Sequence, residues 1–333
     1  MTPRPIFAAL LVFGAVVAAA SIAHAVSTCA FTVAGNTMTL EADCTTDQTI
    51  VVPDGMTLDG ADYTITAVDP LNGSFAGAVV RNGGATAHVT RVTITAAGLK
   101  NVCSPAAPVD RRLRGILFQS ASGAITHNEV IAINKGPSGC QEGNAIEVRN
   151  PPFDGTHPGP VAVEITHNIV DAYQKTGIVV NGDVVAGIHH NHVGESATQT
   201  NLAANAVQIG FGARGTVIHN TIAGNQWCGT SDYVATAVLV FTSDDSTVSK
   251  NNIVGNADVG IYGLGDRLVI DNNRVFDEGP DCNAFGYDYG IGDWGSENVV
   301  TNNKVRGYAV PYDPDTLTGK TAGHNKAIPH PHD

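Results

Sequence analysis

Three charged residues lie in or beside two short segments that have the alternating apolar pattern of β-strands. Glu147 and Arg149 alternate with aliphatic residues, and Lys175 comes directly before the similar segment 176–180. Because successive side chains of a strand point to opposite faces, the charged residues of such a strand share its exposed face. An arginine can neutralise a carboxylate and a lysine can remove a proton, so this set is suited to β-elimination from an acidic sugar.

A β-elimination needs a cation to offset the carboxylate of the sugar, a base to remove a proton and an acid to protonate the leaving oxygen. We assign the cation to Arg149 or Arg114 and the base to Lys175. Tyr173 and Tyr262 are the candidates for the acid. These residues form the first candidate active site.

Hydrolysis of a glycosidic bond instead needs two carboxyl groups, one as acid and one as base or nucleophile. The candidate pairs are Glu147 with Glu142, and Asp258 with Asp288. Nearby polar and aromatic side chains would bind the sugar, because an aromatic ring stacks on a sugar ring while polar groups orient it. The candidates for substrate binding are Arg114, Asn181, Gln208, Asp293, Trp294, Gln141 and Glu142.

The elements that must position these residues are indicated by a repeat. An Asn-x-(Val/Ile) triplet recurs, and a small residue followed by an aliphatic one precedes each triplet, as Gly177-Ile178 precedes Asn191-His192-Val193. The interval between the two signals is nearly constant, which indicates stacked coils of short strands. The triplets begin at Asn128, Asn168, Asn191, Asn220, Asn251, Asn273 and Asn303.

Alignment of the coils on the aliphatic residue separates a column that faces the core from a column that faces solvent. The predicted outward column is Leu117, Glu147, Val179, Gln208, Leu239, Tyr262 and Gly292. Neighbouring coils lie about 4.8 Å apart, so the coils together would form a groove roughly 30 Å long. The long loops around four cysteines should wall one edge of this groove.

The repeats resemble those of the right-handed parallel β-helix proteins, the pectate-lyase-like family, over roughly residues 53–307. In that family the repeated asparagine forms an interior ladder in which each amide bonds to the next coil. The resemblance implies an all-β fold, a single right-handed parallel β-helix. It also implies the activities of the family, which are those of lyases, hydrolases, uronate epimerases and fructan transferases. The family motifs Trp-Ile-Asp-His, Asn-Thr-Asp, Arg-Ile-Lys and Asp-Pro-His-Asp do not occur in this sequence.

We expect one domain in an exported protein. Residues 1–25 have the features of a secretory signal peptide that would be cleaved after Ala25: an early arginine, an apolar run and an Ala-x-Ala site. No other segment is long and apolar enough to span a membrane. Residues 26–307 should form the β-helix, with an N-terminal cap at 26–71, and residues 308–333 should form a tail without repeats.

An even number of cysteines remains after residue 25, which in an exported chain predicts disulfides. Zinc is the alternative, but no Cys-x-x-Cys pair occurs. The register of the coils predicts that the pairs are Cys29 with Cys44, Cys103 with Cys140, and Cys228 with Cys282.

The net charge of −13 argues against nucleic acid and anionic membranes as partners. The acidic run from Asp277 to Asp288 could bind Ca²⁺, or it could be a solvated loop. No other cofactor is expected. Four histidines that each precede a triplet could stack and bind a transition metal, or they could lie at exposed turns. They are His127, His167, His190 and His219.

From these patterns we predict an exported β-helix that cleaves extracellular polysaccharide. Lyase chemistry is favoured over hydrolysis, because Lys175 and Arg149 would otherwise be unexplained. Two alternatives stay open. One is a non-catalytic β-helix that binds glycan or serves as a cell-surface scaffold, and the other is a periplasmic metal-binding β-helix. No oligomeric state is predicted.

Overall fold

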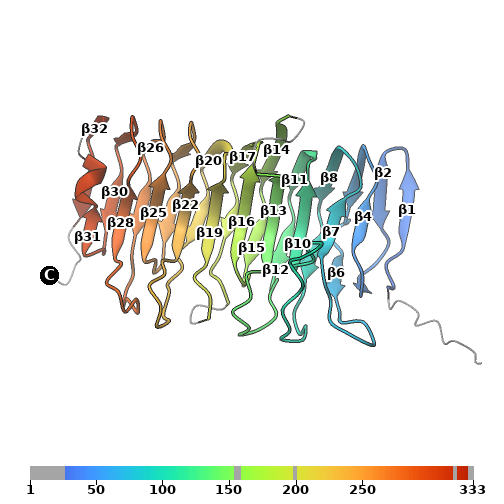
Figure 1. Ribbon diagram of the computed structural model, residues 1–333. Coiled ribbons are helices and arrows are strands. Elements are labelled where there is room, and N and C mark those ends of the chain that lie inside the picture. The colour runs from blue at the N-terminus through green and yellow to red at the C-terminus, as the bar shows by residue number, and fades with distance from the viewer. Residues whose placement is uncertain (1–26, 154–158, 198–200, 318–320, 329–333) are drawn as a thin grey trace, which may run out of the picture.

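The computed structural model describes residues 27–153, 159–197, 201–317 and 321–328. The expected signal peptide therefore lies outside the described residues. The chain winds through three long sheets in turn, so that the coils stack along one axis (Figure 1). The strand pairs of the described residues are parallel except for the first, in which β1 (Phe31–Ala34) runs antiparallel to β2 (Thr37–Leu40).

Each coil contributes one strand to each sheet. Sheet A holds, after β1 and β2, the strands β5 (Met56–Asp59), β8 (Thr86–Thr90), β11 (Ser122–Thr126), β14 (Val161–Thr166), β17 (Val184–His189), β20 (Arg214–Ile218), β23 (Thr247–Ser249), β26 (Val269–Asp271), β29 (Val299–Thr301) and β32 (Thr321–Gly323). Sheet B holds β3 (Cys44–Thr46), β6 (Thr64–Ala67), β9 (Thr93–Thr95), β12 (Glu129–Ile131), β15 (Ile169–Asp171), β18 (His192–Val193), β21 (Thr221–Ala223), β24 (Asn252–Val254), β27 (Arg274–Phe276), β30 (Lys304–Arg306) and β33 (Lys326–Ile328).

Sheet C forms the face that the outward column of the sequence occupies. It holds β4 (Ile50–Val52), β7 (Ala78–Asn82), β10 (Arg114–Gln119), β13 (Asn144–Asn150), β16 (Thr176–Gly182), β19 (Asn205–Gly210), β22 (Thr236–Phe241), β25 (Val259–Leu264), β28 (Tyr289–Asp293) and β31 (Val310–Tyr312). A short 3₁₀ helix, η1 (Pro314–Leu317), follows β31. Within the described ranges, no helix is long and apolar enough to cross a membrane.

The two repeated sequence signals meet inside each coil. A Cβ added at Gly177 would lie 2.7 Å from Cγ1 of Val193, and one added at Gly290 would lie 2.2 Å from Cγ1 of Val305. The small residue of a sheet C strand therefore makes room for the branched residue of the next triplet in sheet B. Such close packing fixes the cross-section of the coil, which explains why the two signals keep a constant spacing.

The asparagines of the triplets form the interior ladder that the resemblance implies. The backbone N–H and Nδ2 of Asn191 both donate to Oδ1 of Asn220, at 2.9 and 3.0 Å, and Nδ2 also donates to the carbonyl of Ile165 at 2.9 Å. The same pattern links the ladder from Asn128 onwards. Because each buried amide is satisfied by the next coil, the column is stable in the interior.

The stack of coils continues beyond residue 307, so the expected tail begins too early. Oδ1 of Asn325 accepts the backbone N–H and Nδ2 of Asn303 at 3.0 and 3.1 Å, which adds one more rung to the ladder. The triplet Asn325-Lys326-Ala327 carries alanine where the others carry valine or isoleucine, which concealed it. At the other end, stacked strands already occur inside the expected cap at 26–71.

The three expected disulfides are confirmed, namely Cys29–Cys44, Cys103–Cys140 and Cys228–Cys282. The second and third join long loops that lead from sheet B into sheet C. These loops project from one edge of the stack, the lower edge in Figure 1. Three disulfides suit an oxidising compartment such as the periplasm or the cell exterior.

Candidate functional site

The outer face of sheet C has the register that the repeat predicts, but its central column is not exposed: Leu117, Glu147 and Val179 are buried, and Gln208, Leu239 and Tyr262 are half-buried. Leu117 pairs with Glu147, Glu147 with Val179, and the column continues to Tyr262 and Gly292. It also extends towards the N-terminus, where Arg81 on β7 pairs with Leu117. The predicted groove therefore begins earlier in the chain than expected and includes an additional arginine.

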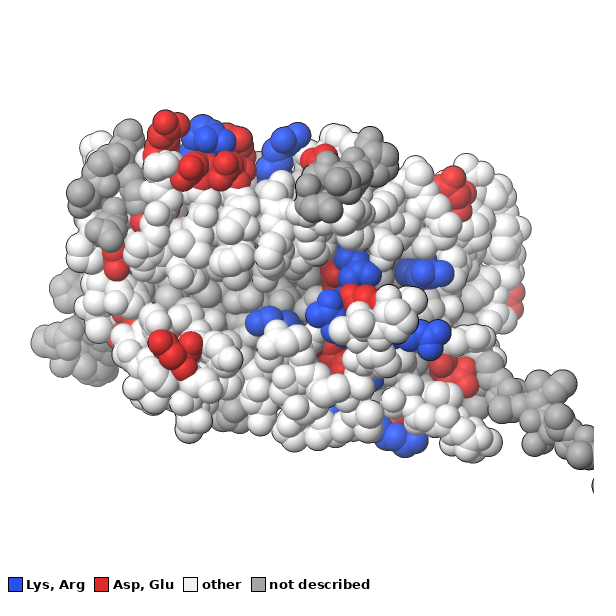
Figure 2. Space-filling view, viewed as in Figure 1, with Lys and Arg blue, Asp and Glu red and all other residues white. Residues whose placement is uncertain are grey.

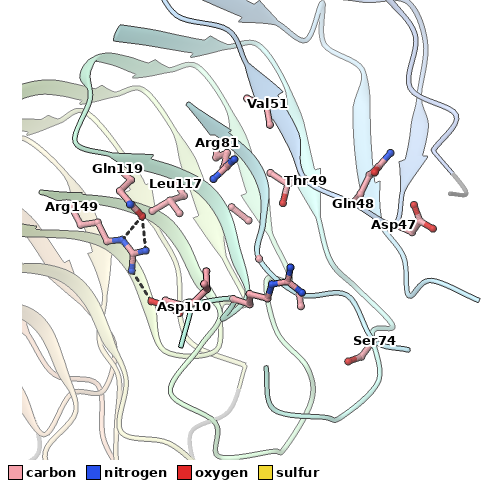
Figure 3. A pocket seen from close by; sticks show the side chains of 15 residues that line it. Asp47, Gln48, Thr49, Val51, Ser74, Arg81, Asp110, Leu117, Gln119 and Arg149 are labelled. Atoms are coloured by element: carbon pink, nitrogen blue, oxygen red, sulfur yellow. Dashed lines mark hydrogen bonds and ion pairs between the residues drawn. The ribbon is translucent and has the colours of Figure 1, made fainter. Parts of the chain in front are cut away.

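The N-terminal part of this face is hollowed into a groove of about 690 Å³ (Figure 3). Its floor comes from β4, β7, β10 and β13, and its wall comes from loop residues 47–49, 74–77 and 109–111. The charged side chains that line it are Asp47, Arg81, Asp110, Arg111 and Arg149. We call this hollow the arginine groove.

Arg114 and Glu147 form a buried ion pair beneath the groove. Nε of Arg114 donates to Oε2 of Glu147 at 2.6 Å, and Nδ2 of Asn144 donates to the same oxygen at 2.7 Å. Burial alone would raise the pKa of Glu147, but the charge and hydrogen bond of Arg114 outweigh it and lower the pKa. Glu147 is therefore a fixed anion, and it is not suited to act as the acid of a hydrolase.

Asp110 joins three arginines at the wall of the groove. Its carboxylate accepts hydrogen bonds from Nε and Nη2 of Arg112, both at 2.9 Å, from Nη1 and Nη2 of Arg114 at 3.0 and 2.7 Å, and from Nη1 of Arg149 at 2.7 Å. Burial raises the pKa of Asp110, but these hydrogen bonds outweigh it and hold the pKa well below its ordinary value. Asp110 is therefore an anion that orients cations.

Arg149 is held in place from both sides within the groove. Its Nε and Nη2 donate to Oε1 of Gln119 at 3.2 and 2.7 Å, while Nη1 bonds to Asp110 (Figure 3). The side chain is 11% exposed, so its edge reaches the groove. A guanidinium fixed in this way presents a preorganised donor to an anion.

The groove and its support are positively charged in a protein of net charge −13. Five arginines stand against three carboxylates, and the arginines Arg81 and Arg111 are exposed. Figure 2 shows basic side chains gathered over the N-terminal half of the sheet C face. The local charge therefore favours an anionic ligand despite the overall acidity.

Lys175 lies apart from the arginine groove. Its Nζ donates to the carbonyl of Ala203 at 2.5 Å, and burial lowers its pKa to about 8. The lining of the groove includes Arg149 but not Lys175. The structure therefore does not bring the expected base and the expected cation into one pocket, although both belong to sheet C coils that are direct neighbours.

The assignment of Tyr173 as the acid is wrong. The ring is completely buried, and its hydroxyl accepts a hydrogen bond from Nδ2 of Asn225 at 2.8 Å. Burial raises its pKa well above the ordinary value. A hydroxyl in the core cannot reach a polysaccharide, so only Tyr262, which is half-buried on the outer face of sheet C, remains of the two candidates.

The carboxyl pair Asp258 and Asp288 does not flank an open site. Asp258 is 1% exposed and accepts the backbone N–H groups of Trp227 and Ala235 at 3.0 and 2.8 Å, and burial raises its pKa to about 7. Oδ2 of Asp288 accepts the backbone N–H of Ala309 at 2.7 Å. The expected hydrolytic role of this pair is corrected, because Asp258 holds a loop against the sheet.

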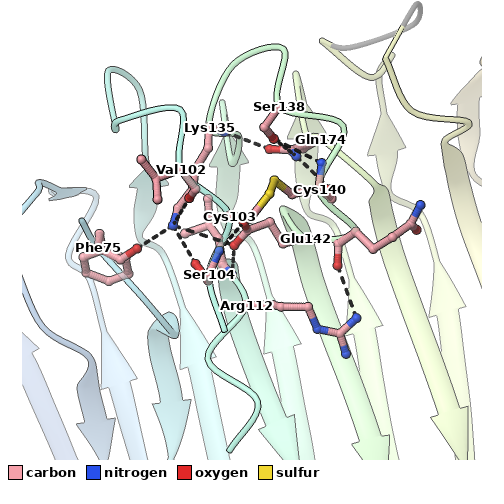
Figure 4. Close-up of a disulfide and its surroundings, with 12 residues drawn as sticks. Phe75, Val102, Cys103, Ser104, Arg112, Lys135, Ser138, Cys140, Glu142 and Gln174 are labelled. Carbon is pink, nitrogen blue, oxygen red and sulfur yellow. Dashed lines mark hydrogen bonds and ion pairs between the residues drawn. A yellow bond between two sulfur atoms is a disulfide. The ribbon is translucent and has the colours of Figure 1, made fainter. Parts of the chain in front are cut away.

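Glu142 is also structural, which corrects both its expected roles. It is buried beside the Cys103–Cys140 disulfide, where its carboxylate accepts the backbone N–H groups of Ser104 at 2.9 Å and Leu113 at 2.7 Å (Figure 4). Nζ of the buried Lys135 lies 3.7 Å from it and donates to Oγ of Ser104 at 2.6 Å. This cluster joins the loop between β9 and β10 to the loop between β12 and β13.

The remaining substrate-binding candidates divide into exposed and buried residues. Nε2 of Gln208 donates to Oδ1 of Asn181 at 3.1 Å on the sheet C face. The exposed Gln141 lies in the loop between β12 and β13. Asp293 is fully buried and accepts Nδ2 of Asn298 at 2.6 Å, so its assignment is wrong. Arg114 is buried as well, and it supports the groove without lining it.

An aromatic patch lies on sheet C near the C-terminal end of the stack. The ring of Trp294 meets that of Tyr262 edge to face at 4.6 Å and that of Tyr289 at 6.3 Å. Trp294 is 37% exposed. An exposed ring of this kind can stack on a sugar.

The four histidines form the predicted column. His127, His167, His190 and His219 stack with ring centroids 4.8, 5.2 and 5.3 Å apart, at exposed turns of left-handed backbone. Their column lies at the turn between sheets A and B, away from sheet C. A metal role for it stays a prediction.

Sequence reasoning missed Arg81, Asp110 and Arg111. Arg81 follows the aliphatic residue Val80, which pairs with Ile116, so an alignment extended by one coil places it in the outward column. Asp110 and Arg111 belong to a loop without register. The only signal for them is the dense run of charges from Asp110 to Arg114.

Comparison with known proteins supports the fold. Residues 156–316 match the family model described as the right-handed beta helix region, which is a little under half of the chain. No curated protein matches the chain in sequence.

Solved structures that are similar in shape share little sequence with the chain. The Dettilon tailspike protein is 14% identical with a TM-score of 0.49, and the match covers 88% of this chain and 55% of that one. DFA-IIIase from Arthrobacter chlorophenolicus A6 is 14% identical with a TM-score of 0.43, with 77% and 64% covered. The periplasmic alginate epimerase AlgG is 10% identical with a TM-score of 0.46, with 89% and 79% covered.

The chain thus spans about half of the tailspike protein and less than two thirds of the DFA-IIIase. The fold itself is shown by the three parallel sheets, the asparagine ladder and the family match taken together. The chain is a right-handed parallel β-helix protein.

Proposed function

We propose that the protein binds an acidic polysaccharide along the outer face of sheet C and that the arginine groove recognises the carboxylates of its sugars. The observation that carries this proposal is the local excess of arginine in a chain of net charge −13. Arg81 and Arg111 are exposed there, and Arg149 is fixed at the floor. Guanidinium groups match the planar carboxylate by paired hydrogen bonds.

Two carboxylates support recognition by orienting the arginines. Asp110 and Glu147 hold Arg112, Arg114 and Arg149 in fixed orientations. Because these contacts exist before the ligand arrives, little side-chain entropy is lost when it binds. Two carboxylates for three arginines leave a net positive charge for the ligand.

The aromatic patch extends the proposed surface. Tyr262 on β25 lies six strands further along sheet C than Arg81 on β7. At about 4.8 Å per strand, the two sites are roughly 29 Å apart. A ligand that contacts both must be a polymer, which favours a polysaccharide over a small acidic sugar.

Cleavage of the bound chain by β-elimination is the second candidate function. Lys175, with its pKa lowered to about 8 by burial, loses its proton near neutral pH more readily than an ordinary lysine and is suited to be a base. A sugar over β16 would lie near it, one coil beyond Arg149. Hydrolysis is less well supported, because Glu147, Glu142 and Asp258 are held by other protein groups.

The first test measures binding and cleavage on the same samples. The protein would be titrated with an acidic polyuronate and with a neutral polysaccharide, at low and high salt. The variant Arg81→Ala with Arg111→Ala should bind the polyuronate at least tenfold more weakly, while the matched variant Arg267→Ala, which removes one exposed arginine from another face, should bind as the parent does. Equal affinity for neutral and acidic chains would refute the proposal.

Ultraviolet absorbance and reducing ends would be followed in the same tubes. Rising absorbance means an unsaturated uronate product, and Lys175→Met should then abolish it without weakening binding. The rate should rise as the pH approaches about 8. Reducing ends without absorbance would refute β-elimination, and silence in both channels would leave the binding function alone.

A further inference from the structure

The loop that joins β27 to β28 gathers three carboxyl groups at the edge of sheet C. Side-chain oxygens of Asp277, Asp281 and Asp288 all lie within 4.8 Å of one another. Cys282 anchors the same loop through its disulfide with Cys228. We call these three aspartates the acidic triad.

Each member of the triad has a protein donor for one oxygen only. Oδ1 of Asp277 accepts the backbone N–H of Gly279 at 3.0 Å, Oδ1 of Asp281 accepts Nε2 of Gln226 at 3.2 Å, and Oδ2 of Asp288 accepts the N–H of Ala309 at 2.7 Å. Oδ2 of Asp277 and Oδ1 of Asp288 are buried and have no donor. Buried carboxylate oxygens that face one another without a cation repel each other strongly.

No lysine or arginine compensates the triad within the residues that the structure describes. The groups that act on its carboxyls are backbone N–H groups, Gln226 and the other aspartates. The side chain of Asp277 is only 2% exposed, so water cannot screen its charge well. A charge in this position needs a proton or a bound cation.

A buried hydroxyl near the same strand ends provides an independent observation. Tyr308, at the turn between β30 and β31, is 5% exposed, and its hydroxyl has no hydrogen-bond partner. A Cβ added at Gly260 would lie 3.0 Å from the Tyr308 hydroxyl and one added at Gly290 would lie 3.3 Å from its ring, so Tyr308 packs beneath the two strands that Asp258 and Asp288 directly precede. Burial raises the pKa of Tyr308 well above its ordinary value, and the charges of Asp277, Asp288, Asp281 and Asp258 add to this. A water on a bound ion would satisfy the hydroxyl.

We propose that the acidic triad binds one Ca²⁺ ion between Asp277, Asp281 and Asp288, with the hydroxyl of Tyr308 facing the hydration shell of the ion. Ca²⁺ takes oxygen ligands at about 2.3–2.6 Å, so ligands on opposite sides of it lie about 4.8 Å apart. Mg²⁺ demands a strict octahedron at about 2.0–2.1 Å and usually keeps several of its waters, so a site of three protein carboxylates suits it less well. The ion holds the loop between β27 and β28 against the turn after β30.

The proposal is tested by calorimetric titration of the chelator-treated protein with Ca²⁺ and, separately, with Mg²⁺. One Ca²⁺ should bind per chain, and Mg²⁺ at least tenfold more weakly. Asp277→Asn and Asp288→Asn should each weaken Ca²⁺ binding at least tenfold. Glu278→Gln removes a charge from an exposed neighbour in the same loop, and it should leave the affinity within twofold.

The exposed Asp281 guards against variants that fail to fold. Asp281→Asn disturbs no packing, and it should still weaken Ca²⁺ binding at least threefold. Ca²⁺ should also raise the melting temperature of the parent and of Glu278→Gln by several degrees, and that of Asp288→Asn much less. The absence of Ca²⁺ binding, or an affinity that is the same in all variants, would overturn the proposal. None of these measurements depends on polysaccharide binding.

Discussion

The protein treats buried carboxylates in opposite ways at two places along the same edge of sheet C. At the arginine groove, the half-buried Asp110 and the buried Glu147 are neutralised by arginines of the protein. In the acidic triad, Asp277 and Asp288 keep buried oxygens without a donor. The first region carries its own cations, while the second depends on a proton or an ion from solution.

The difference appears in the direction of the pKa shifts. Burial raises the pKa of Asp110, but hydrogen bonds from its arginines outweigh burial and lower it, whereas burial raises the pKa of Asp288 to about 6. A cluster that is compensated internally is indifferent to the composition of the solvent. The charge of a cluster that is not compensated changes with the pH and the cations of the solvent. The first region is therefore suited to hold a fixed charge, and the second to bind an ion.

The largest expected effect comes from breaking the compensated region. Arg114→Met leaves Glu147 and Asp110 with fewer donors in a buried place, and it should lower the free energy of unfolding by about 3–5 kcal/mol. Urea-induced unfolding followed by circular dichroism measures this loss. The control Arg267→Met breaks exposed ion pairs with Asp244 and Asp245 and should cost much less. Similar losses in the two variants would show that burial of the cluster adds nothing.

The next effect is a pH dependence of opposite sign in the two regions. Asp288 has its pKa raised from 3.8 to about 6 in the folded state, beside Asp277, Asp281, Asp258 and Tyr308. The unfolded chain therefore releases its proton first, and the free energy of unfolding should fall as the pH rises from about 4 to about 6. Because Asp288 is partly exposed, the change should be roughly 1–2 kcal/mol.

Unfolding in chelator across this pH range provides the measurement. Asp288→Asn should flatten the slope, and Ca²⁺ should do the same in the parent protein. The lowered pKa of Asp110 acts in the other direction, since its contribution is present above pH 4 and is lost only as the pH falls below it. A parent protein whose stability rises steadily from pH 4 to pH 6 would contradict the raised pKa of Asp288.

The smallest effect compares two tyrosines at equivalent turns. Tyr173→Phe removes the acceptor of Nδ2 of Asn225 and should cost about 1 kcal/mol. Tyr308→Phe removes a buried hydroxyl that has no partner, so in chelator it should cost nothing or stabilise the protein slightly. Thermal unfolding of the two variants side by side decides the matter, and equal losses would mean that the Tyr308 hydroxyl is satisfied in solution.

Features that repeat were predictable from the sequence. The outward column, the asparagine ladder and the disulfides all follow from one register, which recurs in successive coils. Because many coils show the same pattern, the fold is predicted correctly even when one coil, such as that of Asn325, is not recognised.

Features made by a loop were not predictable. Glu147 has the pattern of an exposed residue, but Asp110 from a wall loop brings arginines over it, and only 3% of it is exposed. Loops without register give no spacing from which such contacts could be inferred. Tyr173 is a different case, because it follows its ladder asparagine by five residues, as Ile133 and Tyr308 do, and all three are buried. Alignment of that turn would have placed it inside.

The asparagine ladder also sets a regular spacing of equivalent coils along the molecule. Each rung after Asn128 accepts the same two hydrogen bonds from the rung before it, so these rungs are interchangeable. Asn251 and Asn273 are separated by 22 residues with no long loop between them. A chain that gained such a coil between the arginine groove and β25 would keep its core and move the aromatic patch and the acidic triad by one strand spacing, about 4.8 Å, relative to the arginine groove. The length of ligand needed to reach from the arginine groove to the aromatic patch therefore changes in steps of one coil.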